Sequence, residues 1–194
     1  MVLTASTAAA LGSPLPLALL QQELVPVHGG PLPTTLAGRP LLLLFLCPHC
    51  PFVKHIEPEL SRLEADLGAQ LQLLAVCSNS TRTHPQDGPA GMAEQAQRCG
   101  WSFPYLADPR QTVAKALAAA CTPDLYLYDQ QLQLYYRGQL DGSRPGNALP
   151  CDGADLRQAI DHLLAGDPPP QEVQASIGCN IKWHPGEEPA WFGA

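Results

Sequence analysis

The sequence predicts an α/β fold in which a central mixed β-sheet carries helices on both faces. Two apolar runs indicate this fold, Leu41–Leu46 and Leu71–Cys77, because continuous apolar segments of this length are typical of strands buried on both faces. The segment between them, residues 52–67, places apolar side chains at helical spacing. A strand, a helix and a strand in this order make the two strands parallel neighbours through a right-handed crossover.

The chain before the first apolar run predicts an N-terminal β extension. We expect strands at residues 12–20 and 24–27, followed by a turn at His28-Gly29-Gly30. Further on, Pro58 should bend the helix of residues 52–67, and Gly68 should end it.

The second half of the chain predicts alternating helices and strands. The expected helices are residues 90–99, the alanine-rich 109–120, and 154–164 with Asp152 as its cap. The expected strands are an edge piece at 103–106 and a hairpin of 125–128 and 132–137, which adds antiparallel edges. We therefore expect one domain, residues 1–166, onto which a proline-rich tail, residues 167–194, packs without regular structure of its own.

Charge and cysteine content restrict the partners and the location. The net charge is −7 with only three lysines, which argues against nucleic acid and an anionic membrane as partners. Residues 1–20 lack the basic start of a signal peptide, and Ser13-Pro14-Leu15-Pro16 interrupts their apolar stretch. Seven cysteines, an odd number at irregular spacing, do not fit a secreted disulfide framework. We expect a cytoplasmic protein.

The strongest chemical signal is Cys47-Pro48-His49-Cys50, which lies between the first predicted buried strand and the helix that follows. The unpaired amides and positive end of a helix favour a thiolate on Cys47, and the two-residue spacing lets Cys50 close a disulfide. We therefore predict Cys47 as the nucleophile and Cys50 as the resolving thiol. His49 adds a positive charge or a hydrogen-bond donor beside Cys47, which stabilises the reduced form and makes the disulfide more oxidising.

Redox chemistry is not the only role of a cysteine pair. Buried cysteines often only pack. Half of a zinc site would need a second pair at zinc spacing, which the sequence lacks. Haem attachment needs a histidine directly after the second cysteine, where Pro51 stands. A C-x-x-C motif after a strand in a βαβ context favours redox chemistry.

Longer segments resemble the thioredoxin-like branch of the peroxiredoxin/AhpC-TSA superfamily. Residues 45–55, Phe-Leu-Cys-Pro-His-Cys-Pro-Phe-Val-Lys-His, resemble the active-site stretch of a redoxin subgroup. Other similar segments are Gly12–Pro16, Cys121–Asp124, Tyr136–Asp141 and Ser176–Trp183, so the resemblance covers nearly the whole chain. It implies a thioredoxin-like fold in which Thr122-Pro123 is a cis-proline loop facing the cysteines. It also implies that Pro48, Thr122 and Pro123 contact an extended substrate chain.

Two departures from related families bear on the activity. Leu44 stands where peroxiredoxins have a hydroxyl residue that orients peroxide. The predicted strand before the cysteines also lacks the buried carboxylate of true thioredoxins. Both departures weaken the inference that this chain has the activity of a peroxiredoxin or of a thioredoxin.

Three functions remain open from the sequence. The first is a thiol–disulfide oxidoreductase in redox homeostasis, acting on protein or small-molecule thiols and disulfides. The second is a thiol-dependent peroxidase, in which Cys47 passes through a sulfenic acid and Cys50 condenses with it. The third is a non-catalytic redoxin scaffold that binds a partner or a soft metal through the cysteine pair. We expect no cofactor, and the sequence carries no signal for an oligomeric state.

Overall fold

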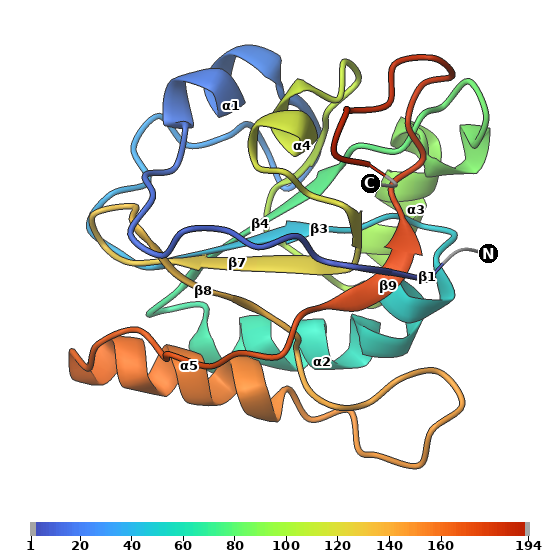
Figure 1. Ribbon diagram of the computed structural model, residues 1–194. Helices are drawn as coiled ribbons and strands as arrows, with labels where there is room; N and C mark the ends of the chain where they lie inside the picture. Colours follow the sequence, from blue (N-terminus) through green and yellow to red (C-terminus); the bar gives the residue numbers. More distant parts are fainter. Residues whose placement is uncertain (1–2, 193–194) are drawn as a thin grey trace.

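The centre of the protein is a mixed six-stranded sheet with the strand order β2-β5-β4-β3-β7-β8 (Figure 1). The computed structural model describes residues 3–192, so residues 1–2 of the expected domain and 193–194 of the expected tail lie outside the described residues. The strands are β2 (Val25–His28), β3 (Leu41–Phe45), β4 (Gln72–Cys77), β5 (Tyr105–Ala107), β7 (Asp124–Tyr128) and β8 (Leu134–Gly138). Strand β3 runs parallel to β4 and antiparallel to β7, which confirms the predicted mixed sheet and its parallel pair.

Helices cover both faces of this sheet, as the sequence predicts (Figure 1). One face carries α1 (Leu17–Glu23) and α4 (Thr112–Ala116), and the other carries α2 (Pro51–Leu67), α3 (Pro89–Cys99) and α5 (Ala154–Ala165). A short 3₁₀ turn, Pro85–Asp87, precedes α3. Among residues 3–192, no helix is both long and apolar enough to cross a membrane.

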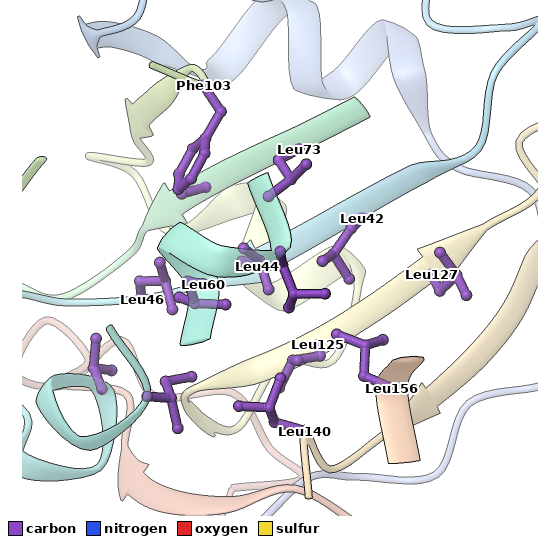
Figure 2. Close-up of a cluster of buried hydrophobic side chains, with 14 of the residues drawn as sticks. Leu42, Leu44, Leu46, Leu60, Leu73, Phe103, Leu125, Leu127, Leu140 and Leu156 are labelled. Atoms are coloured by element: carbon purple, nitrogen blue, oxygen red, sulfur yellow. The ribbon is translucent and has the colours of Figure 1, made fainter. Parts of the chain in front are cut away.

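The side chains of β3 alternate between the two layers of the core. Leu42 and Leu44 pack in the cluster beneath α2 and α5 (Figure 2), whereas Leu41 and Leu43 pack with α1 and α4. Because successive strand residues point to opposite faces and both faces are covered, every position of this strand is apolar. The continuous leucine run is therefore the direct result of double burial.

A second, three-stranded sheet joins the two ends of the chain to its middle. It consists of β1 (Leu3–Ala5), β9 (Ile177–Asn180) and β6 (Cys121–Thr122), in the order β1-β9-β6. In Figure 1, β9 runs beside β1 on the side of the molecule where α2 begins. The expectation that the tail lacks regular structure is wrong, because β9 gains hydrogen-bonding partners along both of its edges.

The strand expected at residues 12–20 is also wrong. Residues 17–23 form helix α1, and only Pro14 makes an isolated bridge, with Gln133. The segment after Pro16 consists of leucine, alanine, glutamine and glutamate, which all favour a helix, and Leu20 is fully buried on the α1 face of the sheet. Local helix propensity and the burial of Leu20 therefore account for the helix in place of the expected strand.

Helix α4, strand β5 and the start of helix α5 also differ from the expectations. Helix α4 spans residues 112–116 rather than 109–120, because the left-handed residues Gln111 and Ala118 bracket it. Strand β5 is not an edge, since β2 pairs with its outer side. The N-cap of α5 is Gly153 rather than Asp152, although the Asp152 carboxylate accepts a hydrogen bond from the Ala154 amide.

Candidate active site

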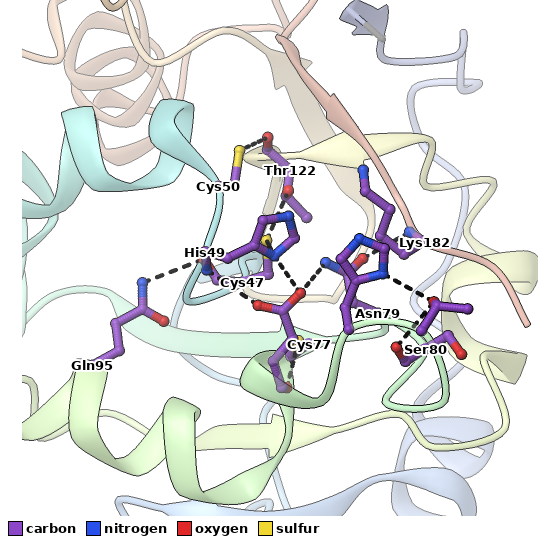
Figure 3. Close-up of polar contacts among 12 residues, drawn as sticks. Cys47, His49, Cys50, Cys77, Asn79, Ser80, Gln95, Thr122 and Lys182 are labelled. Atoms are coloured by element: carbon purple, nitrogen blue, oxygen red, sulfur yellow. Dashed lines mark hydrogen bonds and ion pairs between the residues drawn. The ribbon is translucent and has the colours of Figure 1, made fainter. Parts of the chain in front are cut away.

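Cys47 and Cys50 lie where β3 passes into α2, as the sequence predicts (Figure 3). Cys50 is the N-cap residue of α2, and both cysteines are fully buried. Thr122 faces both sulfurs from β6. Its hydroxyl oxygen lies 3.3 Å from Cys47 Sγ, and its carbonyl oxygen accepts a hydrogen bond of 3.2 Å from the Cys50 thiol. The peptide bond between Thr122 and Pro123 is cis, which confirms the expectation drawn from the resemblance.

His49 lies between Cys47 and a buried carboxylate. Its Nδ1 is 3.9 Å from Cys47 Sγ and 2.5 Å from Oδ2 of Asp87. The His49 backbone amide donates to the other oxygen of Asp87, and Asn79 Nδ2 donates to Oδ2. Because the Asp87 side chain is fully buried, these donors hold its charge at a defined place beside the histidine.

Asp87 is a site residue that the sequence did not reveal. It lies between the predicted strand of residues 71–77 and the predicted helix of residues 90–99, and an acidic residue in such a connection is ordinarily solvated. The structure folds that segment into the 3₁₀ turn next to the cysteines. His84 comes from the same segment, and its ring stacks on that of His49 with the centroids 5.1 Å apart. Only the path of this loop brings these groups to the site.

The pKa values of the two thiols shift in opposite directions. Burial raises the pKa of Cys47, and its hydrogen bond to Cys50 and the negative charge of Asp87 raise it further. The hydrogen bond from Cys47 is the main cause that lowers the pKa of Cys50 to about 5, with further hydrogen bonds from Cys179 and the Val53 amide. These directions run against the expectation of a thiolate on Cys47, whereas the Cys50 thiol, which donates to the Thr122 carbonyl oxygen, agrees with it. The lower pKa of Cys47 stays a prediction.

A proton shift within the pair produces a second charge arrangement. When Cys50 takes the proton of Cys47, the Cys50 thiol donates to the Thr122 carbonyl, at the observed 3.2 Å. The Cys47 thiolate is then left beside the Thr122 hydroxyl and the His49 ring, which lie 3.3 and 3.9 Å from its sulfur. Charged sulfur is stabilised by such donors. The site therefore supports a thiolate on either cysteine.

A third thiol, Cys179 of β9, contacts the pair. Cys179 is buried in the same side-chain cluster as Cys50 and is the strand partner of Thr122. Burial, followed by the interaction with Cys50, raises the pKa of Cys179 to about 12. Strand β9 already covers one edge of β6, so an extended substrate chain would have to approach Thr122 from its other edge.

A buried polar group supports the backbone of Cys47 from α3. Gln95 Nε2 lies 3.5 Å from the carbonyl oxygen of Cys47 (Figure 3) and 2.8 Å from Glu57 Oε1. The Tyr105 hydroxyl donates to Gln95 Oε1 at 3.1 Å, so the amide is held at both ends. Gln95 also lines a hollow of ≈ 250 Å³, together with Pro48, His49, Lys54 and Arg98.

One group of side chains in the described part of the chain has the composition of a metal site. Cys47 Sγ, His49 Nδ1 and an Asp87 carboxylate oxygen all lie within 4.8 Å of one another. Thiolate, imidazole and carboxylate are all zinc ligands. The hydrogen bonds from His49 and Asn79 nevertheless account for the Asp87 carboxylate without an ion.

Residues 27–137 match the family model of the AhpC/TSA family, and this span contains both cysteines and Thr122-Pro123. The chain belongs to the AhpC/TSA family. Two similar solved structures extend the match to nearly the full length. An uncharacterized conserved protein from Geobacillus kaustophilus is 41% identical, with coverage of 96% of this chain and 98% of that one and a TM-score of 0.88. A hypothetical protein from Sinorhizobium meliloti 1021 is 37% identical, with coverage of 94% and 100% and a TM-score of 0.84.

A more distant solved structure shows the type of fold. It is a thioredoxin-like protein in the oxidized form, 21% identical over 82% of this chain and 99% of that one, with a TM-score of 0.64. A comparison with curated proteins gives no match. The chain is therefore a thioredoxin-like redoxin of the AhpC/TSA superfamily, as the sequence predicts.

Proposed function

We propose that this redoxin is a thiol–disulfide oxidoreductase in which Cys47 and Cys50 form the redox pair. The observation that carries the proposal is the fully buried cysteine pair at the first turn of α2, with Thr122 contacting both sulfurs. Spacing, burial and the shared proton give this pair the means to open and close a disulfide.

The reaction starts with the proton shift from Cys47 to Cys50. The Cys47 thiolate attacks one sulfur of a substrate disulfide, and the bond between the two substrate sulfurs breaks as a mixed disulfide forms. Cys50 then attacks Cys47 Sγ, which breaks the mixed disulfide and forms the Cys47–Cys50 disulfide. Two electrons pass to the substrate, which leaves as one thiol and one thiolate: the single proton of the pair leaves with the thiol, and water protonates the thiolate. Oxidation of a dithiol substrate follows the same steps in reverse.

His49 and Thr122 act as positioning residues in this scheme. Both place hydrogen-bonding groups next to Cys47 Sγ, and Asp87 holds the His49 ring in that place. These groups stabilise the charge on Cys47 both before attack and when Cys47 is the leaving thiolate. The substrate class is protein or small-molecule disulfides and thiols that reach Cys47 past Pro48 and His49.

The proposal is tested by following turnover of a small disulfide and of a protein disulfide substrate with a dithiol reductant. Wild-type protein is expected to turn over at least one of them, Cys47→Ser to lose turnover, and Cys50→Ser to accumulate a mixed disulfide on Cys47. The matched control is Cys99→Ser, whose cysteine ends α3 away from the pair. Wild-type protein that forms no Cys47–Cys50 disulfide under oxidising conditions would refute the proposal.

A thiol-dependent peroxidase is a second candidate, favoured by one observation. Thr122 Oγ1 lies 3.3 Å from Cys47 Sγ and supplies from β6 the hydroxyl that the sequence lacks at Leu44. In that reaction Cys47 attacks a peroxide oxygen to give a sulfenic acid and an alcohol or water, and Cys50 condenses with it and releases water. Turnover of peroxide that exceeds turnover of disulfides, and that falls in Thr122→Val, would favour this candidate.

The third candidate, a scaffold that holds a soft metal, has a direct test. Elemental analysis of the purified protein, with a count of free thiols, separates it from both enzymes. Stoichiometric metal that protects Cys47 and Cys50 from alkylation would support the scaffold and contradict the oxidoreductase. A cytoplasmic location remains a proposal from the sequence, and cell fractionation tests it.

A further inference from the structure

Cys179 is buried against the redox pair by a strand from the far end of the chain. Its register partner in β6 is Thr122, the residue whose carbonyl oxygen lies 3.2 Å from Cys50 Sγ. Cys179 also belongs to the same buried cluster as Cys47 and Cys50, and the Cys179 and Cys50 thiols shift each other's pKa. Cys50 therefore has a thiol neighbour on each side, one in its own motif and one in the tail.

The structure holds this third thiol firmly in place. Strand β1 pairs with the outer edge of β9, with Leu3 opposite Cys179, so β9 is held from both sides. Gly178 packs directly on the Thr122–Pro123 peptide, and a Cβ at this position would overlap the Thr122 carbonyl oxygen. The close approach of β9 thus depends on glycine at position 178, and this approach brings Cys179 to Cys50.

We propose that Cys179 is a third redox thiol, which exchanges with the Cys47–Cys50 disulfide to form a Cys50–Cys179 disulfide. This inference rests on the proposed function and adds a step to it. The sulfur of Cys179 attacks Cys50 Sγ, the Cys47–Cys50 bond breaks, and its electron pair leaves on Cys47. The proton lost by Cys179 passes to Cys47. No net oxidation or reduction occurs, because one disulfide replaces another.

The environment favours this exchange specifically in the oxidised protein. In the reduced protein, burial raises the pKa of Cys179, and the neighbouring Cys50 with its negative charge raises it further. Oxidation of Cys50 removes that charge, whereas Lys182, which lowers the pKa of Cys179, remains. The departing Cys47 sulfur meets the Thr122 hydroxyl and the His49 ring, which stabilise it as it leaves.

The consequence is that the oxidised protein keeps a free thiol at its reactive position. The disulfide moves inward to Cys50 and Cys179, and Cys47 returns to the thiol form beside Pro48 and His49. Cys47 is then able to attack a second disulfide substrate before the first disulfide has been reduced. A two-cysteine site has no such state, since its oxidised form contains no free thiol.

Mapping of disulfides in the full-length protein tests the inference. The protein is equilibrated over a range of oxidised-to-reduced glutathione ratios, quenched with acid, blocked with N-ethylmaleimide, and digested without reduction. Mass spectrometry is expected to find two isomers in the wild type, one with Cys47–Cys50 and Cys179 blocked, the other with Cys50–Cys179 and Cys47 blocked. Cys47→Ser is expected to retain the Cys50–Cys179 disulfide, and Cys179→Ser to retain only Cys47–Cys50.

The matched control is Cys121→Ser, because Cys121 is also buried in β6 but its thiol lies 3.5 Å from the Pro123 carbonyl oxygen. This variant is expected to keep both isomers. Wild-type protein that forms Cys47–Cys50 at every ratio, with Cys179 always blocked, would overturn the inference and leave the proposed function intact. Wild-type protein with Cys47 and Cys50 both blocked at every ratio would instead overturn the proposed function. Both outcomes are measured on the wild-type protein, so the test does not depend on whether any variant folds.

Discussion

His49 Nδ1 lies 2.5 Å from Asp87 Oδ2 and 3.9 Å from Cys47 Sγ, so one ring nitrogen faces both a buried carboxylate and the proposed nucleophile. The carboxylate orients the ring, while its negative charge raises the pKa of Cys47. The histidine therefore separates two groups that repel each other when both are ionised. This relationship, rather than the presence of a histidine within the motif, determines what a substitution at His49 does.

His49→Ala is expected to slow attack by Cys47. The substitution removes the ring that lies between Cys47 Sγ and the Asp87 carboxylate and that hydrogen-bonds to this carboxylate. The Asp87 charge then acts on the sulfur without the ring between them, which raises the pKa of Cys47. Each unit of pKa lowers the thiolate tenfold but raises its nucleophilicity, so the rate should fall about threefold per unit at neutral pH. Turnover and iodoacetamide labelling of Cys47 measure it. The control is His55→Ala, because the His55 ring contacts Ser143 rather than the cysteine pair. Equal rates in the wild type, His49→Ala and His55→Ala would mean that His49 is only a spacer.

The reduction potential is expected to depend on pH with an unusual slope. Reduction takes up only one proton while Cys50 remains a thiolate, that is, above its pKa of about 5 and up to the raised pKa of Cys47. The potential should therefore fall by about 30 mV per pH unit in this window, and by about 59 mV per unit below pH 5, where two protons are taken up. Equilibration with glutathione at several pH values measures the slope. A value near 59 mV throughout pH 6–8 would show that Cys50 is protonated there.

Gly178→Ala is expected to displace β9 from β6. The added Cβ overlaps the Thr122 carbonyl oxygen, and neither backbone is able to move as a flexible side chain does. We expect a loss of about 1–3 kcal/mol in the free energy of unfolding, as for other overpacked sites. The yield of Cys50–Cys179 should also fall while Cys47–Cys50 still forms. Thermal unfolding and disulfide mapping check both parts.

The control for that variant is Gly142→Ala, whose added Cβ meets only the terminal side-chain carbon of Leu149, at 3.3 Å. This variant is expected to unfold near the wild-type temperature and to form both disulfides. If Gly178→Ala behaves in the same way as this control, the close contact between β9 and the Thr122–Pro123 peptide does not position Cys179.

Arg137→Met is expected to destabilise the strand that follows Pro123. Arg137 Nη2 lies 2.9 Å from Asp124 Oδ2, both side chains are almost fully buried, and the guanidinium lies 4.3 Å from the ring centroid of Tyr126. Removal of one partner of a buried pair leaves an uncompensated charge and costs about 3–5 kcal/mol. Denaturant unfolding measures this, and the double variant Asp124→Asn/Arg137→Met is expected to recover much of the loss.

The loss in Arg137→Met should also depend on pH. Burial already raises the pKa of Asp124, and removal of the guanidinium raises it further. A carboxyl whose pKa is higher in the folded state favours folding at low pH, and this contribution disappears as pH rises through the folded pKa. The variant should therefore lie closest to wild type near pH 4 and fall further behind as pH rises towards 7. A deficit independent of pH would show that lost packing, rather than the Asp124 charge, causes it.

The local features of the fold were predictable from the sequence. The run Leu41–Leu46 must be buried on both faces, because no other surroundings suit a continuous apolar strand in a globular protein. The helical spacing of residues 52–67 and the two-residue spacing of Cys47 and Cys50 are likewise properties of a short segment. They determine that a cysteine pair opens a helix at the end of a central strand.

The partners of that pair were decided by the tertiary structure. Asp87, Cys179 and the strand β9 became part of the site because distant segments pack there, and a single sequence carries no measure of such distances. Even the order of the two thiol pKa values depends on them, since it follows from burial, from the Asp87 charge and from hydrogen bonds donated by Cys47 and Cys179. The cysteine pair and its place at the start of a helix are thus local properties of the sequence. The packing of the loop and tail sets the charges around the pair, because electrostatic effects in a buried site depend on three-dimensional proximity.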